Sequence, residues 1–194
     1  MKPDRLALLM ALLPLLGTAV PLLEYAFAPS RKSAGLPSRL AAVLGLVGPL
    51  VVLALLYPYI ANGGVIRFNI GDWSPIVAIQ YRLDGPAWFA CVLVAVVSIC
   101  SGVYALVRRE YSAIYWFLFL LCVYSLQSAL LAADFFHLFV CLELMALSSY
   151  TLIAYKKDGK ALFASFNYLA VSTAAIILYL FGLYLIYETS GTLS

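Results

Sequence analysis

Residues 135–155 read FFHLFVCLELMALSSYTLIAY, an apolar stretch with a single acidic side chain, Glu143, near its middle. About 20 helical residues span the hydrocarbon layer of a membrane, so the stretch is long enough to cross it. A carboxylate at that depth costs about 2.5–3.5 kcal/mol and is kept mainly where it faces a bundle interior or a water-filled path. The stretch therefore predicts a transmembrane helix in which Glu143 handles protons or ions. The alternative is a neutral Glu143 that hydrogen-bonds to a neighbouring helix.

The composition of the whole chain is that of an integral membrane protein. Hydrophobic residues make up 65% of its 194 residues and charged residues 11%, and the mean hydropathy is +1.01. Soluble proteins carry about 25% charged residues. Apolar runs of spanning length cover Leu6–Ala28, Leu40–Ala61, Pro86–Val107, Ser112–Ala133, Phe135–Tyr155 and Ala161–Tyr187. The sequence therefore predicts an all-α integral membrane protein with six transmembrane helices.

The first apolar run follows Lys2 and Arg5, as the apolar part of a signal peptide would. It exceeds the usual length of about 7–15 residues and lacks a clear small-residue cleavage site, so we expect it to be retained as a helix. The predicted organisation is then two N-terminal helices in residues 1–61, an outer hairpin in residues 62–85 and four helices in residues 86–194.

The stretch Asn62–Asp84 is the extended segment between the second and third predicted helices. Apolar and polar residues alternate along residues 65–70 and again along residues 79–83, on either side of a segment with Gly and Pro. This pattern is typical of a β-hairpin. We expect the hairpin to lie on the outer surface, where it either clips the subunit to a neighbour or caps the helix ends. Trp73 and Tyr81 are expected at the membrane interface, where aromatic rings with a polar edge gather.

The distribution of basic residues predicts the orientation in the membrane. Four lie on one side, at Lys2, Arg5, Arg67 and Arg82, and eight on the other, at Arg31, Lys32, Arg39, Arg108, Arg109, Lys156, Lys157 and Lys160. Because cytoplasmic loops carry the excess of Lys and Arg, loops one, three and five are expected in the cytoplasm. Both termini then lie on the outer face of the cell membrane. The net charge of +3 follows from this bias and is no reason to expect nucleic-acid binding.

Four further polar residues are candidates for a proton or ion path. Tyr150 lies two turns from Glu143 near the same helix face and is a candidate hydrogen-bond partner, while Gln127 and Asn167 come from the neighbouring helices. Polar side chains at this depth usually bond across helices, so ordinary packing is the alternative role for each. Histidine titrates near pH 6.5, at about the physiological range, but the place of His137 at a helix boundary favours an interfacial residue over a proton relay.

The four cysteines fall within the predicted spans, at Cys91, Cys100, Cys122 and Cys141. They lack the clustered spacing of a metal or redox site, so we interpret them as small buried apolar residues and expect no metal, cofactor or catalytic site in this chain. The middle of each predicted span also lacks Lys and Arg. A carboxylate that cycles its charge needs a positive partner within about 6 Å, and we expect that partner to come from elsewhere.

The stretch Asp134–Ala154 resembles the fifth helix of antiporter-like membrane subunits, and the segments Gly71–Asp84 and Leu183–Leu193 resemble the same family. The family includes subunits of Mrp-type cation/proton antiporters, respiratory complex I, and membrane-bound hydrogenases and sulfur reductases. The resemblance implies that the chain forms the first part of an antiporter-like fold. It also implies that Glu143 pairs with a lysine on a seventh helix and that this ion pair gates the movement of protons, with sodium as a further candidate ion.

The seventh helix would lie beyond the 194 residues, so we expect the lysine to come from another membrane subunit of a multi-subunit complex. Asn167 stands where many relatives carry a lysine, a departure from the family pattern. The expected function is that of a lipid-embedded subunit of a cation/proton-translocating complex, with Glu143 in a proton path completed by another subunit. The alternative is a structural or assembly subunit, a truncated remnant without transport of its own.

The predicted orientation can be tested by labelling single cysteines with a reagent that does not cross the membrane. Lys157→Cys should be protected in intact cells, because it belongs to the basic side, and Asp72→Cys should react. Reaction of Lys157→Cys from outside, with the membrane intact, would reverse the orientation and move the hairpin to the cytoplasmic face.

Overall fold

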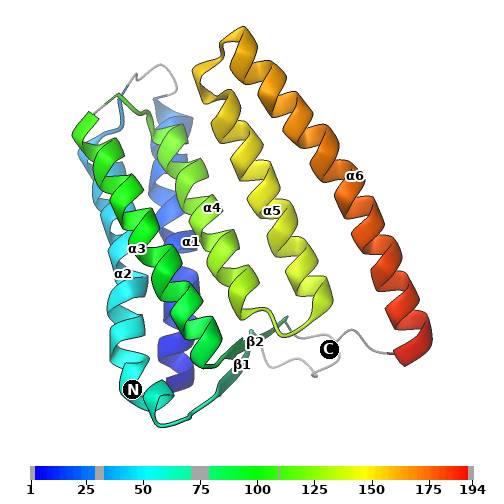
Figure 1. The fold of residues 1–194 in the computed structure, drawn as a ribbon. Helices are drawn as coiled ribbons and strands as arrows, with labels where there is room; N and C mark the ends of the chain where they lie inside the picture. Colours follow the sequence, from blue (N-terminus) through cyan, green and yellow to red (C-terminus); the bar gives the residue numbers. More distant parts are fainter. Residues whose placement is uncertain (1–2, 29–32, 71–78, 109, 192–194) are drawn as a thin grey trace.

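The computed structural model describes residues 3–28, 33–70, 79–108 and 110–191. Within these residues the chain forms six long helices and one two-stranded sheet (Figure 1). Their bounds are α1 Pro3–Phe27, α2 Leu36–Ala61, β1 Ile66–Ile70, β2 Ile79–Leu83, α3 Gly85–Arg108, α4 Ala113–Leu131, α5 Phe135–Ile153 and α6 Gly159–Ser190, with a short 3₁₀ turn at Ala154–Lys156. All six helices are long and apolar enough to cross a membrane. The predicted all-α membrane fold with a small β-hairpin is confirmed.

Helix α4 lies at the centre of the fold and packs against α1, α2, α3 and α5. Its Leu120 is fully buried and lies against Gly17 of α1 and Gly45 of α2. A Cβ added at Gly17 would be 3.2 Å from the Ala41 carbonyl oxygen and 3.3 Å from Leu120 Cδ1. Small residues at this crossing therefore let three helix backbones approach closely, which is how membrane helices gain packing energy.

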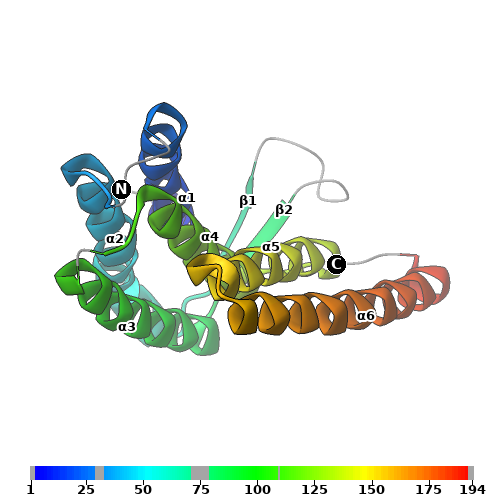
Figure 2. The same ribbon diagram turned by 90° about the horizontal axis from the view of Figure 1, so that it is seen from above.

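Helices α5 and α6 extend from this bundle as a pair (Figure 2). The two helices are joined by hydrogen bonds from the Tyr179 hydroxyl to the Phe135 carbonyl, 2.8 Å, and from Ser165 Oγ to the Tyr150 carbonyl, 2.7 Å. The buried residues of α6 are Ser165 and Leu183. Most of the remaining surface of α6 is exposed and apolar, so in a membrane it meets lipid or other protein.

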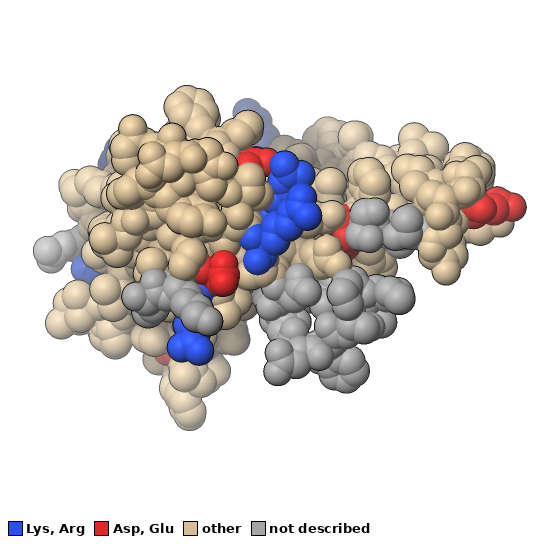
Figure 3. Space-filling view, turned by 90° about the horizontal axis from the view of Figure 1, so that it is seen from below, with Lys and Arg blue, Asp and Glu red and all other residues tan. Residues whose placement is uncertain are grey.

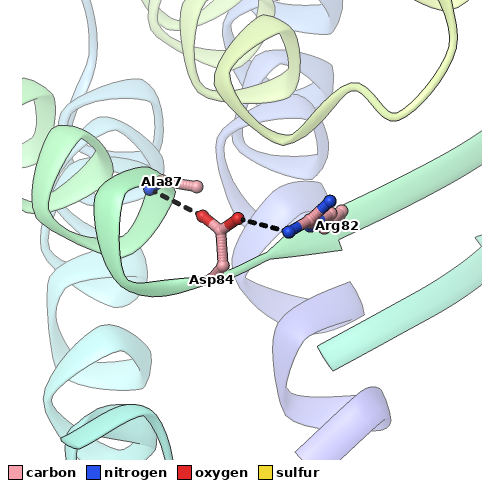
Figure 4. Close-up of polar contacts among 3 residues, drawn as sticks. All are labelled: Arg82, Asp84 and Ala87. Carbon is pink, nitrogen blue, oxygen red and sulfur yellow. Dashed lines mark hydrogen bonds and ion pairs between the residues drawn. The ribbon is translucent and has the colours of Figure 1, made fainter. Parts of the chain in front are cut away.

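The hairpin pairs β1 with β2 antiparallel, with Arg67 opposite Arg82 and Phe68 opposite Tyr81. The inward face is buried and consists of Ile66, Phe68, Tyr81 and Leu83. Arg67 and Arg82 are exposed, at the end of the molecule where basic side chains are visible (Figure 3). Asp84 then connects the hairpin to α3: one carboxylate oxygen pairs with Arg82 Nη2 at 3.1 Å, and the other accepts the Ala87 N–H at 3.1 Å (Figure 4).

The hairpin is also fixed to the turn between α4 and α5. Tyr81 pairs with Ala132 in a single β-bridge, and the Ala133 N–H donates to the Gln80 carbonyl at 3.0 Å. The prediction that Tyr81 is an interfacial residue is therefore wrong: its side chain is 1% exposed and stacks on Phe68 with ring centroids 5.1 Å apart. Trp73, predicted at the interface with it, and Asp72, proposed for labelling, lie outside the described residues.

The close crossing of α1, α2 and α4 can be tested with Gly17→Val. The added side chain overpacks the crossing, so we expect the chain to lose about 1–3 kcal/mol of stability, measured by thermal unfolding in detergent micelles. The matched control is Gly182→Val on α6, where an added Cβ meets nothing within 4 Å, and which should unfold close to the wild-type temperature. Equal unfolding temperatures for both variants would contradict this packing.

Candidate functional site

Glu143 is half-buried near the middle of α5. It follows Phe139 by four residues and therefore shares the same helix face. Phe139 stacks on Tyr179 of α6 with ring centroids 6.3 Å apart. The neighbouring side chains Val140 and Leu147 are exposed, so the Glu143 face is covered by α6 on one side and open on the other.

The Glu143 carboxylate has no hydrogen bond or ion pair to any of the described residues. The predicted hydrogen bond to Tyr150 is thus absent; Tyr150 is half-buried, and its backbone carbonyl instead accepts from Ser165 of α6. Asn167, the candidate on α6, is exposed. Because a lone carboxylate at membrane depth is costly, the open side of this face is where a partner from outside the described residues would reach Glu143.

A second group of polar residues lies at the hairpin end of α4 and α5. The Tyr81 hydroxyl and Ser128 Oγ are 2.7 Å apart, and Ser128 Oγ is 3.2 Å from His137 Nε2. The Cys141 sulfur, one turn further along α5, lies 3.5 Å from the same nitrogen. His137 is only 5% exposed and Ser128 is fully buried, so these side chains form a continuous buried hydrogen-bonded chain from the hairpin to α5.

The burial of His137 shows that the prediction of an interfacial residue at this position is wrong. Asp134 caps α5, and its carboxylate accepts the His137 backbone N–H at 2.6 Å and the Gln80 N–H at 3.4 Å. The hairpin covers His137 because two of its residues are bonded nearby: Gln80 to the cap residue Asp134, and Tyr81 to Ser128. Nothing in the local sequence around His137 indicates this cover, since it comes from residues more than 50 positions earlier.

Gln127 is a third polar feature, buried in α4 with 1% of its surface exposed. Both atoms of its amide lack a hydrogen-bond partner among the described residues. Gln127 follows Leu120 by seven residues, about two helical turns, and so points toward α1 and α2, whereas Glu143 lies toward α6. An unpaired buried amide costs about 1–3 kcal/mol, which marks the α1–α2–α4 interior as a place where a polar partner would stabilise the fold.

The cysteines divide into two kinds. Cys91 and Cys141 are buried and Cys122 is half-buried, whereas Cys100 is exposed, so the prediction of four buried residues is wrong for Cys100. In a membrane, an exposed thiol on an apolar helix such as α3 meets lipid at little cost. Cys141 is more than the small apolar residue that the sequence predicts, because its sulfur lies against the imidazole of His137. In the part of the chain that the structure describes, no three His, Cys, Asp or Glu side chains gather as metal ligands would.

Comparison with known proteins gives matches in both sequence and fold. Residues 132–194 match the family described as NADH:quinone oxidoreductase/Mrp antiporter, transmembrane. A subunit of a probable K(+)/H(+) antiporter from Rhizobium meliloti is 31% identical over 66% of this chain and 24% of its own length. A subunit of NADH-quinone oxidoreductase from Desulforudis audaxviator is 32% identical over 70% of this chain and 28% of its own length.

The match to solved structures covers nearly the whole chain. A chain of the membrane-bound sulfane sulfur reductase, an archaeal respiratory membrane complex, aligns with 97% of this chain and 38% of its own length, with a TM-score of 0.84 and 28% identity. The present chain spans about a quarter of the length of the two curated relatives. The six apolar helices and these matches make it a multi-pass membrane protein. The predicted resemblance is therefore confirmed: in sequence and in fold the chain is similar to antiporter-like membrane subunits, and it corresponds to part of such a larger subunit.

Proposed function

We propose that the chain is a membrane subunit of a cation/proton-translocating complex and that Glu143 carries protons within it. The observation that supports this most directly is the state of the Glu143 carboxylate. It is half-buried on α5, one turn from the contact of Phe139 with Tyr179 of α6, at the depth of a membrane span, and is without a partner among the described residues. Intramembrane carboxylates of this kind are found mainly where they serve proton or ion movement.

The proposed mechanism alternates the charge of Glu143. A positive group within about 6 Å favours the ionised carboxylate, and its withdrawal in a low-dielectric setting favours the protonated acid. A lysine from another subunit, approaching on the open side of the α5 face and then receding, would make Glu143 release and take up a proton in turn. Protons are the proposed cargo of this residue, with sodium as a candidate for the exchanged cation.

The other proposed path residues have different support. His137 is buried in a hydrogen-bonded chain, and Gln127 is buried with an unpaired amide; both would interact favourably with a mobile proton or a hydrated path. Tyr150 lies two turns from Glu143 on α5, and Asn167 lies on the exposed surface of α6, where it would face another subunit rather than Glu143. We propose the cell membrane as the location, with the hairpin and both termini on its outer face.

The proposal is tested with Glu143→Gln in the intact complex, reconstituted in sealed vesicles. The amide keeps the shape of the acid but cannot exchange a proton, so we expect proton or antiport flux per assembled complex to fall about a hundredfold or more, the range of a lost proton-transfer group. The matched control is Glu188→Gln at the exposed end of α6, which should transport as the wild type does.

The opposite result would favour a structural or assembly subunit. If Glu143 is a permanently neutral hydrogen-bonding group, Gln replaces it well and flux is unchanged. Glu143→Ala would then be the damaging change, because it leaves the partner of Glu143 unpaired, and the amount of assembled complex would fall. Equal flux in wild type and Glu143→Gln, with equal assembly, contradicts the proposed function.

A further inference from the structure

In the buried chain of Tyr81, Ser128 and His137, the positions of the hydrogens decide which group donates and which accepts each hydrogen bond. Each hydroxyl has one O–H to donate, and a neutral imidazole has one nitrogen that accepts. If His137 Nε2 is the accepting nitrogen, Ser128 donates to it and Tyr81 donates to Ser128, across the separations of 3.2 and 2.7 Å. All three side chains are at most 5% exposed, so these bonds are largely shielded from bulk water.

Protonation of His137 would reverse the direction of this chain. The imidazolium carries a hydrogen on both nitrogens, so Nε2 must donate to Ser128, and Ser128 must then donate to Tyr81. The heavy atoms need not move, because each oxygen can donate or accept. A chain whose hydrogen bonds can reverse their direction in this way can pass a proton from one end to the other.

Burial disfavours a positive charge on His137 and the nearby Asp134 carboxylate favours it, so the imidazolium is a short-lived state. The titratable groups near His137 come from several elements. Asp134 at the start of α5, Cys141 within α5 and Tyr81 of β2 lie closest. Further away, Tyr124 of α4 neighbours Tyr81, and Tyr179 of α6 lies near Asp134. The Asp134 carboxylate accepts the backbone N–H of His137, and its negative charge would stabilise the imidazolium. Burial raises the pKa of Tyr81 well above its usual range, so the phenol keeps its proton and serves as a neutral donor and acceptor.

We propose that Tyr81, Ser128 and His137 form a proton relay that connects the hairpin side of the membrane with the interior of α5. A hydronium ion on the hairpin side gives a proton to the Tyr81 oxygen, the Tyr81 proton moves to Ser128, and the Ser128 proton moves to His137 Nε2. O–H and N–H bonds form and break in equal number, and the charge of +1 passes from hydronium to the imidazolium. The relay rests on the proposed function, because it would serve the same proton movement as Glu143, which lies on another face of α5.

The relay is tested in the intact complex in sealed vesicles with Ser128→Ala, Tyr81→Phe and His137→Gln. Ser128→Ala and Tyr81→Phe each remove one hydroxyl and little volume, and each should lower proton flux about a hundredfold or more, as loss of a positioned proton-transfer group does. His137→Gln should in addition alter the dependence of flux on pH, because it removes the imidazole that accepts the relayed proton. The matched control is Ser125→Ala, also fully buried in α4, whose hydroxyl donates only to its own helix at Cys122 O, 2.9 Å; its flux should be that of the wild type.

The structural alternative is that these bonds only fasten the hairpin to the helices. In that case the unfolding temperature of the complex falls in the variants, but flux per assembled complex and its pH profile stay as in the wild type, and the relay is overturned. If Ser128→Ala prevents assembly, Tyr81→Phe decides, since it keeps the ring stacked on Phe68. Loss of flux in Glu143→Gln together with normal flux in the relay variants would reject the relay and keep the proposed function. Normal flux in Glu143→Gln would reject the proposed function itself.

Discussion

The whole structure depends on one constraint: within the hydrocarbon layer there is no water, so every polar group must find its partner inside the protein. Most do. The hydroxyls of Ser125 and Ser148 donate to carbonyls of their own helices, and Asp134 caps α5 with its carboxylate. The carboxylate of Glu143 and the amide of Gln127 are among the groups that lack partners in the described residues. Of the two, Glu143 can carry a charge, so its missing partner is the costlier at membrane depth.

The constraint also explains the division of the molecule into a bundle, formed by α1 to α4, and an exposed arm, helix α6. Helices α1 to α4 bury one another through close glycine crossings, whereas α6 buries little more than Ser165 and Leu183. Glu143 sits where the two parts meet, on the helix that packs against both α4 and α6. The hairpin reaches the same helix from its end through Tyr81 and Asp134. Helix α5 is therefore the element that links the hairpin, the bundle and the exposed arm.

Much of this fold could be predicted from the sequence, because spanning length and hydropathy are local properties. The six helices lie within a few residues of the predicted runs, and the strands Ile66–Ile70 and Ile79–Leu83 fall in the two alternating stretches. The burial of Tyr81 and His137 could not be predicted, since it depends on the hairpin folding onto a turn more than 50 residues later in the chain. The local sequence around Tyr81 is the same whether its hydroxyl hydrogen-bonds to lipid headgroups or to the buried Ser128. The exposure of Cys100 was missed for a related reason: in an apolar span, hydropathy does not distinguish the face that meets lipid from the face that meets protein.

The central claim is that Glu143 receives its partner from outside the described residues, as a positive charge. A structure of the intact complex tests this most directly, through the distance from the Glu143 carboxylate oxygens to the nearest Lys or Arg nitrogen. We predict such a nitrogen within about 6 Å, the range in which it would favour the ionised carboxylate, supplied on the open side of α5 beside Val140 and Leu147. A carboxylate covered by lipid or by apolar side chains, with every Lys and Arg nitrogen well beyond that range, would contradict the account.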